Sequence, residues 1–227
     1  MKFLFAAAAC ASALAAPVAL AQGTLDLLYV PQTEFGIEVS DPSIGSVSDD
    51  VDGDGFGVRG MGRAGERAAV RAEYQSVTYK DDNGPGEADI DQLRFGLGVI
   101  GASTSGVFAE YNKVDVDDLK LDGYALHGRL AGNPSPQMQL YADVGWARLE
   151  DENGSDWRGP EFSVGAAVGL SPAFAVLFDY RVTRLEASED TTTVEFEFTD
   201  LRVGGRLMFG SEQGPPKPRK KARRKAG

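Results

Sequence analysis

Three features are scarce in this sequence: cysteine, histidine and long apolar segments. Cys10 is the single cysteine and His127 the single histidine. Beyond Gln22 no apolar run approaches the roughly 20 residues that a helical membrane span requires. If Cys10 is removed with a leader, the remaining chain can form no disulfide and no thiolate metal site. The composition therefore excludes a disulfide scaffold, and if the protein enters a membrane it does so as a β-barrel.

The first 21 residues have the composition of a secretory signal peptide. A short basic start is followed by an almost wholly apolar stretch, and Ala19-Leu20-Ala21 forms an A-x-A cleavage pattern before Gln22. A lipoprotein signal at Cys10 is disfavoured because Ala7 stands where such signals have a leucine-like residue. We predict cleavage after Ala21.

Charge is distributed unevenly along the chain. The whole sequence has a net charge of −11, whereas residues 22–210 hold 15 basic and 33 acidic residues, a net of −18. The difference arises because segment 211–227 is rich in Lys, Arg and Pro, a low-complexity composition that predicts disorder. The predicted organisation is a signal peptide (1–21), one folded domain (22–210) and a basic tail (211–227).

The folded domain alternates apolar and polar residues with a period of two, which predicts β-strands. One parity is apolar and the opposite parity carries charges and glycines. About ten strands are expected, with eight as the alternative, in an all-β antiparallel up-and-down barrel. Their expected ranges are 24–39, 55–62, 66–79, 90–100, 105–113, 121–131, 137–149, 161–170, 173–186 and 194–209.

The last expected strand ends in the most informative segment of the chain. Its apolar residues share one face and its arginines share the other, which suits a wall with lipid outside and a polar lumen inside. Just before it, the apolar parity slips between Phe198 and Leu201, which indicates either a bulge or the emergence of the strand from the membrane. The apolar residues of this closing strand are Leu201, Val203, Leu207 and Phe209.

The connections between the expected strands alternate between short and long. Segments 63–65, 101–104, 132–136 and 171–172 are brief, while 40–54, 80–89, 114–120, 150–160 and 187–193 are longer and hold most of the acids. Short periplasmic turns and longer outer loops are typical of transmembrane barrels. A soluble sandwich or lipocalin-like barrel is the alternative, because its strands also alternate. Aromatics near the strand ends predict interfacial girdles, with Tyr79, Tyr111, Tyr124, Trp146 and Trp157 on one side and Phe174 and Phe209 on the other.

The signal peptide, the alternating connections and the closing strand together give a family resemblance. Residues 22–209 resemble a small Gram-negative outer-membrane β-barrel, similar to the transmembrane domain of outer-membrane protein A and related porin-like barrels. The resemblance implies location in the outer membrane, and a closing strand that the barrel-assembly machinery reads. The chain departs from that archetype in its ten strands and in the tail that follows Phe209.

The polar parity predicts a network of opposite charges inside the barrel. A barrel of this size has an interior that side chains can fill, and buried charges should pair. We therefore expect a plugged lumen and a structural or surface-interaction role, with a narrow channel for ions or small solutes as the alternative. The residues expected in this network are Arg71, Glu73, Arg94, Glu110, Arg129, Asp143, Asp179, Arg181, Arg202 and Arg206.

No pattern in the sequence predicts catalysis or a cofactor. His127 lies on the polar parity of strand 121–131, and no cluster of serine, histidine and acid converges in the sequence, so a membrane-embedded lipid A-modifying enzyme or protease is a second, weaker alternative. Asp50, Asp52 and Asp54 match the opening of a calcium loop, but Met61 stands where that loop needs a glutamate. A solvated acidic segment is the simpler interpretation, so no metal is expected.

Several partners follow from the predicted location. The resemblance implies contact with outer-membrane lipid, lipopolysaccharide and the barrel-assembly machinery. The basic tail is expected in the periplasm, where anionic lipid or a cell-wall polymer would be its partner. Nucleic acid is not expected, because the chain is secreted.

Overall fold

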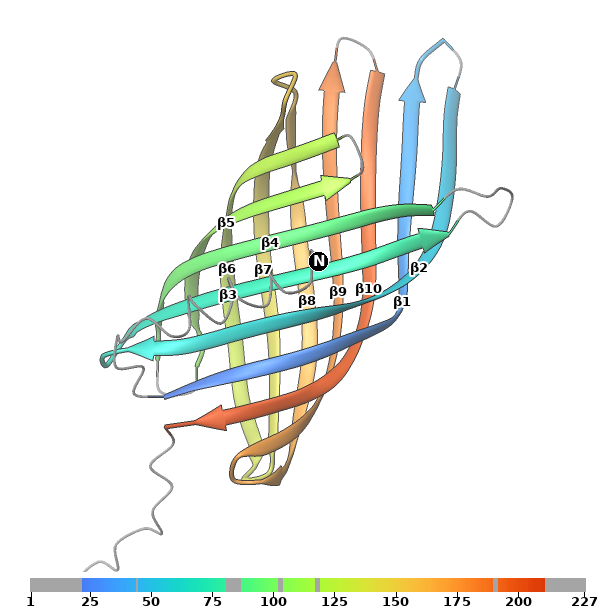
Figure 1. Ribbon diagram of the computed structural model, residues 1–227. Helices are drawn as coiled ribbons and strands as arrows, with labels where there is room; N and C mark the ends of the chain where they lie inside the picture. Colours follow the sequence, from blue (N-terminus) through green and yellow to red (C-terminus); the bar gives the residue numbers. More distant parts are fainter. Residues whose placement is uncertain are drawn as a thin grey trace, which may run out of the picture.

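The computed structural model describes residues 22–43, 45–80, 87–101, 104–116, 119–189 and 192–210 (Figure 1). The expected signal peptide and basic tail lie outside these residues. Ten antiparallel strands form one closed barrel in which each strand pairs with its neighbours in the chain and β1 pairs with β10. The prediction of an all-β up-and-down barrel with ten strands is confirmed. Among the described residues, no helix is both long enough and apolar enough to cross a membrane.

The strands are long, and their bounds extend past most of the predicted ranges. They are β1 (Gln22–Asp41), β2 (Gly45–Ala64), β3 (Ala68–Lys80), β4 (Glu87–Ile100), β5 (Gly106–Val116), β6 (Leu119–Ser135), β7 (Met138–Asp151), β8 (Asp156–Ser171), β9 (Phe174–Glu189) and β10 (Thr192–Phe209). Gly23 pairs with Phe209, so the chain enters and leaves the barrel at one end. We call this the terminal end and the opposite end the far end.

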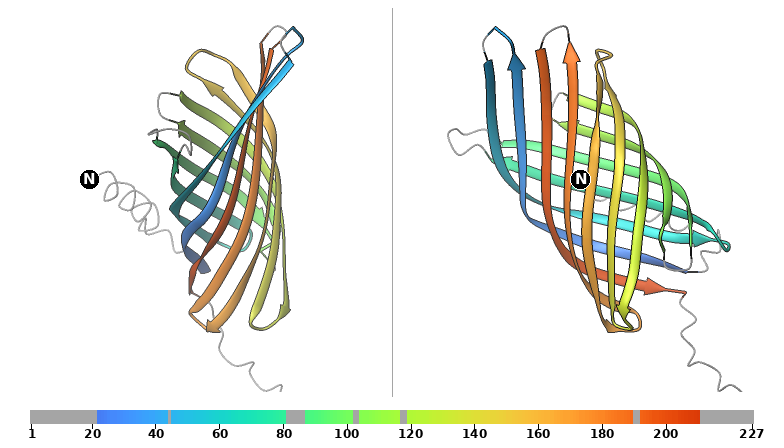
Figure 2. Two further views of the ribbon diagram at one scale, coloured as in Figure 1. Left: turned by 90° about the vertical axis from the view of Figure 1, so that its right-hand side faces the viewer. Right: turned by 180° about the vertical axis from the view of Figure 1, so that it is seen from behind.

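The expected difference between short turns and long loops is wrong in detail. Most of segment 40–54 is strand, because Val47 and Val51 pair with Val39 and Phe35 of β1 in a continuous ladder. The asymmetry lies instead in strand length: the β1–β2 and β9–β10 hairpins rise furthest at the far end (Figures 1 and 2). The acids of these segments therefore belong largely to strand walls and not to loops.

A bulge in β1 bends the wall at the level where the inner and outer faces of the barrel exchange polarity. The register shifts between Tyr29 and Gln32 against β10 and between Val30 and Thr33 against β2. Pro31 lies at this point, where its missing N–H removes no ladder hydrogen bond. Strand β10 pairs with β9 without any shift, so the parity slip that the sequence shows in β10 marks the emergence of the strand and not a bulge.

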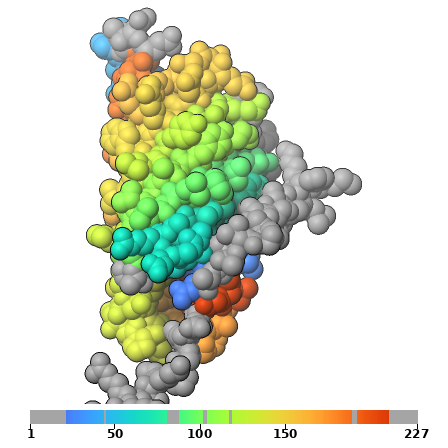
Figure 3. Space-filling model, turned by 90° about the vertical axis from the view of Figure 1, so that its left-hand side faces the viewer, coloured from blue at the N-terminus to red at the C-terminus, as the bar shows by residue number. Residues whose placement is uncertain are grey.

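Near the terminal end the outer surface of the barrel is apolar. Large hydrophobic side chains on every other residue point outward and are about half exposed, including Leu27, Leu97, Leu126, Val144 and Phe178. Figure 3 shows part of this wall as diagonal bands of packed side chains, from teal β3 through green β4 and β5. A soluble barrel would place these residues inside, so that alternative is wrong. A closed barrel with an apolar outer band is the architecture that spans Gram-negative outer membranes.

Toward the far end the polarity of the two faces reverses. The outer positions become charged, and the interior holds an apolar cluster that we call the apolar cap. Two residues predicted for the aromatic girdle, Tyr79 and Trp157, belong to this interior because their strands have already left the apolar band. Tyr111, Tyr124 and Trp146 do point outward. The apolar cap consists of Phe35, Val77, Tyr79, Ile90, Val114, Leu121, Ala125, Ala147, Leu149, Trp157, Leu185, Phe196 and Phe198.

Candidate functional site: a charged plug inside the barrel

The interior of the membrane section is filled by ionisable side chains in equal numbers. Among the described residues, seven arginines and seven carboxylates are buried there, and we call this set the charged plug. Because every second residue of a strand faces the lumen, each strand can contribute several of these groups at regular spacing. The charged plug consists of Asp26, Arg59, Arg71, Glu73, Arg94, Glu110, Arg129, Asp143, Glu161, Asp179, Arg181, Asp200, Arg202 and Arg206.

Arg202 lies at the centre of the plug. Its side chain is fully buried, and its guanidinium donates to Asp179 through Nε at 2.6 Å and to Glu73 through Nη1 at 2.8 Å. Arg181 approaches the same Glu73 carboxylate at 2.5 Å and Asp200 at 3.1 Å. Charge-assisted bonds of this kind are about twice as strong as neutral ones. The centre of the plug therefore links β3, β9 and β10 across the lumen.

A second group of contacts lies toward the terminal end. Asp26 accepts from Arg206 Nε at 2.7 Å and from Arg59 Nε at 3.0 Å. The Tyr141 hydroxyl donates to Asp179 at 2.5 Å, and the Arg129 guanidinium lies 4.2 Å from the centre of the Tyr141 ring. These contacts join the first strand to the last and bring β7 into the network.

The third group surrounds the single histidine. Arg94 forms two bonds with Glu161, at 2.7 and 3.2 Å, and His127 Nε2 lies 2.8 Å from the same carboxylate. Glu110 lies 3.6 Å from His127 Nε2 and 3.4 Å from Arg71 Nη1. His127 is 3% exposed, so it belongs to an enclosed network.

Glycines provide the space that these large side chains occupy. A Cβ on Gly145 would lie 2.4 Å from His127 Nδ1, and one on Gly165 would lie 2.4 Å from the Tyr141 hydroxyl. No ordinary Cβ contact is that short, so both positions require glycine for the plug to keep its packing. The glycines on the polar parity of the sequence are therefore part of the plug.

The structure places all ten residues predicted for the lumen network inside the barrel, where all are buried. Sequence reasoning missed Asp26, Arg59, Glu161 and Asp200. Asp26 and Arg59 lie opposite each other in the β1–β2 ladder, and their alternation with apolar neighbours could have identified them. The inward facing of Asp200 was missed because the apolar parity changes beside it, between Phe198 and Leu201.

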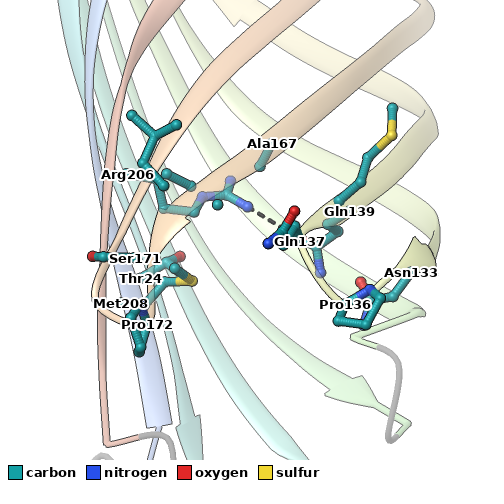
Figure 4. Close-up of a pocket in the computed structure, with 14 residues that line it drawn as sticks. Thr24, Asn133, Pro136, Gln137, Gln139, Ala167, Ser171, Pro172, Arg206 and Met208 are labelled. Carbon is teal, nitrogen blue, oxygen red and sulfur yellow. Dashed lines mark hydrogen bonds between the residues drawn. The ribbon is translucent and has the colours of Figure 1, made fainter.

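A cavity of about 510 Å³ opens at the terminal end, below the plug (Figure 4). Its upper part is formed by Arg206, which donates to Gln139 at 2.8 Å, and by the small side chains Ala167 and Ala175. Pro136 and Pro172 of two short turns line its lower part. The cavity is an open vestibule that ends at the charged plug.

The aspartates of the incomplete calcium pattern lie in strand β2 and not in a loop. Asp50, Asp52 and Asp54 occupy alternate positions of an extended strand, which spreads them along the wall and prevents them from converging on one ion. Asp54 lies 3.5 Å from Lys80 of the next strand. Within the ranges that the structure describes, no three acidic, histidine or cysteine side chains are grouped to hold a metal.

The closing strand has the facing that its sequence pattern predicts. Leu201, Leu207 and Phe209 point outward and are between 39% and 45% exposed, whereas Arg202 and Arg206 are buried in the plug. Val203 shares the outward parity. Recognition of this strand by an assembly machinery stays a prediction.

No protein-family model matches the sequence, and no curated protein matches it. Solved outer-membrane barrels are similar in structure. The outer membrane protease OmpT from Escherichia coli is 11% identical with a TM-score of 0.46, covering 83% of this chain and 97% of that chain. OprG from Pseudomonas aeruginosa is 12% identical with a TM-score of 0.39, covering 84% and 96%. Ail, the attachment invasion locus protein of Yersinia pestis, is 11% identical with a TM-score of 0.28, covering 81% and 98%. At these scores the likenesses carry no argument about activity.

Proposed function

We propose that this protein is a non-conducting, non-enzymatic outer-membrane barrel with a structural or surface-interaction role. The observation that carries the proposal is the balance of the charged plug: seven buried arginines meet seven buried carboxylates. A water path would have to separate several of these pairs at once. Leaving one buried charge without its partner costs about 3–5 kcal/mol, so an opening that leaves several charges unpaired at once would be rare.

The apolar cap supports the same function from the far end. Trp157 stacks on Phe196 with ring centroids 4.4 Å apart, and Leu121 and Leu185 are almost completely buried beside them. Ions do not cross a packed apolar layer without losing their hydration. The proposed barrel thus has two barriers in series, one charged and one apolar.

The proposed orientation places the far end outside the cell, with the terminal end and the basic tail in the periplasm. The acids on the outer strand walls would then face the surface layer of lipopolysaccharide. Outer-membrane lipid, lipopolysaccharide and the assembly machinery are the partners this orientation implies. A periplasmic tail would reach anionic lipid or cell-wall polymer.

The non-enzymatic part of the proposal is supported by the position of the only histidine. His127 is enclosed between Glu110 and Glu161 in the plug, below the apolar cap. A substrate at the surface could not reach it. Among the described residues of the far end, serine hydroxyls such as those of Ser40 and Ser188 contact carboxylates, and the single histidine lies next to none of them.

Planar-bilayer conductance of the refolded full chain tests the proposal. We expect no steady current from the natural sequence. A double variant that weakens both barriers, Arg202→Ala with Trp157→Ala, should give frequent current bursts, whereas Lys80→Ala on the outer wall should not. Steady ohmic conductance of the natural sequence would replace this proposal with the narrow-channel alternative.

A further inference from the structure

Strand β2 extends past its neighbour β3 at the far end and leaves one of its edges without a partner. The last pair between the two strands is Asp52 with Lys80, and residues 45–51 of β2 lie beyond it (Figure 1). Among the described residues, these seven pair with β1 alone, and we call them the free edge. On the other side of the same projection, β9 extends only three residues past its last pair with β8. An unpaired edge presents a row of N–H and C=O groups to which another strand can add.

The inner face of the free edge is apolar with one charge in its middle. Val47 and Val51 lie opposite apolar residues of β1 and so share the inner side of the sheet. Asp49 lies between them on the same side, opposite Ile37, which packs against the apolar cap. An inward-pointing charge on an edge strand opposes pairing with a wholly apolar strand. A strand that fits this face therefore needs a basic residue between two apolar ones.

The outer face beside the free edge carries acids that no cation neutralises. Glu34 and Glu38 of β1 share this face with Asp50 and Asp52 of β2. Within the part of the chain that the structure describes, none of these four carboxylates has an ion pair: a glutamine and a serine of β1 donate to the two glutamates, and the lysine that ends β3 contacts Asp54 instead. Uncompensated surface charge of one sign attracts a partner of the opposite sign and repels a like one.

The same charges disfavour a second copy of this chain at the free edge. Antiparallel pairing of two free edges about Ser48 would place Val47 of each copy opposite Asp49 of the other. It would also join two acidic outer faces into one sheet, where like charges on neighbouring strands are destabilising. The charge pattern therefore favours a basic strand from another protein.

We propose that the free edge binds an extended basic peptide segment, which adds to the sheet antiparallel to β2 in the place that β3 leaves. This inference rests on the proposed surface-interaction role and names the kind of partner. Because side chains of a strand alternate between its faces, basic residues of the segment would lie beside Asp50 on the outer face. On the inner face, apolar residues would meet Val47 and Val51, and one further basic residue would meet Asp49. Main-chain hydrogen bonds supply the affinity and the alternate side chains supply the selectivity.

Synthetic peptides test this pairing directly. The probe is the dye-labelled, acetylated peptide Val-Lys-Lys-Lys-Val-Lys-Val, which in an antiparallel ladder places Val, Lys and Val opposite Val51, Asp49 and Val47. A second peptide, Val-Lys-Val-Lys-Val-Lys-Val, places Val opposite Asp49. A third has Glu in place of every Lys, and a fourth is the probe with N-methylated backbone nitrogens, which cannot form the ladder. Fluorescence anisotropy with the refolded full chain in an uncharged detergent would measure binding, and heat-modifiable migration on gels would establish that each variant is folded.

The probe should bind saturably, and the second peptide about threefold more weakly, because it lacks one surface ion contact. Asp49→Val should reverse this preference. The N-methylated probe should bind about tenfold more weakly or worse, since several hydrogen bonds are lost, and the glutamate peptide should not bind. In the complex, alternate amides of residues 45–51 should exchange more slowly by NMR.

The outer acids are tested by a matched pair of double variants. Asp50→Asn with Glu38→Gln should weaken the probe about fivefold. The control, Asp122→Asn with Glu150→Gln, removes two exposed acids that face each other in the paired β6–β7 ladder, and it should leave binding unchanged.

Full binding of the N-methylated probe, unchanged amide exchange in residues 45–51, or the same peptide preference in Asp49→Val would overturn the proposal. Self-association of the chain that protects these amides without any peptide would also overturn it, because a second copy would then occupy the edge. Conductance tests the closed lumen separately. A non-conducting barrel that binds no peptide would overturn this inference alone.

Discussion

The membrane section and the far-end section of this barrel use the same ten strands with opposite polarity. In the membrane section the outside is apolar and the inside is charged; in the far-end section the outside is charged and the inside is apolar. On β10, Arg202 and Phe198 both face inward, only four residues apart, yet one belongs to the charged plug and the other to the apolar cap. The ladder between β9 and β10 continues through both without a shift. The medium around the wall, and not the strand itself, decides where apolar side chains go.

The two interiors are held together by different forces. Lipid is as apolar as leucine, so in the membrane section burying apolar groups inside gains little, and ion pairs and hydrogen bonds fill the lumen instead. The far-end section stands in water, where an apolar interior is stabilised by the hydrophobic effect. Variants that act on one force should therefore affect one section more than the other.

The largest effect should come from removing the central arginine of the plug. Arg202→Met leaves Asp179 and Glu73 with one cation fewer in a buried site, which should destabilise the barrel by about 3–5 kcal/mol. Urea unfolding in detergent would measure it. Lys80→Met is the control, since its contact with Asp54 is largely exposed and should be worth about 0–1 kcal/mol. Equal losses for the two variants would contradict a stabilising charged plug.

A cavity in the apolar cap should rank next. Leu185 is 1% exposed, and Leu185→Ala should cost about 3 kcal/mol, within the usual range for buried leucines. Proteolysis should then become faster at the far-end hairpins while the membrane section stays protected. Leu201→Ala on the lipid face is the control and should cost less, because lipid refills the space. A greater loss from Leu201→Ala would mean that the cap contributes little.

A smaller effect should follow from filling a glycine position in the plug. Gly165→Ala places a methyl group against Tyr141, and overpacking of this kind costs about 1–3 kcal/mol. Gly132→Ala is matched to it, since a Cβ there would meet nothing within 4 Å. Thermal unfolding of the two variants would separate a packing effect from a general glycine effect. If both variants unfold alike, Tyr141 is not tightly enclosed.

The smallest effect concerns pH at a far-end hairpin. Burial would raise the pKa of the Asp151 carboxyl, but hydrogen bonds from the backbone N–H groups of Ser155 and Asn153 lower it. A lowered pKa means that the stabilisation is present above the unfolded value of about 3.9 and is lost as the pH falls through the folded value. The Asn153 amide shift, followed by NMR from pH 7 to pH 2, should report this. Asp151→Asn should abolish the transition, and a transition that survives in that variant would have another source.

Much of the fold could be predicted because alternation fixes both strand and facing. The closing strand shows why: outward Leu207 and inward Arg206 differ by one residue, and no other register buries the arginine. The facing of the side chains in the far-end section was harder to predict from the sequence, because there the apolar residues point inward and the charged residues point outward. From the sequence alone, Phe196 and Phe198 belong to the apolar parity and are expected to face lipid, because the sequence does not show that the membrane ends between Phe198 and Leu201. Trp157, Tyr79 and Asp200 were misplaced or missed for the same reason.

The charged plug also constrains how the barrel can form. Arg206 of β10 neutralises Asp26 of β1, and the two residues are 180 positions apart in the chain. Arg202 and Glu73 are separated by 129 positions. Until the last strand meets the first, Asp26 can pair with Arg59 of the next strand and Arg202 with Asp179 of the preceding one, but the contacts of Arg206 with Asp26 and of Arg202 with Glu73 are missing. Lipid does not solvate the charges that are left over. A partly assembled sheet is therefore unstable in the bilayer. Insertion of the strands and closure of the barrel must proceed together as one cooperative step.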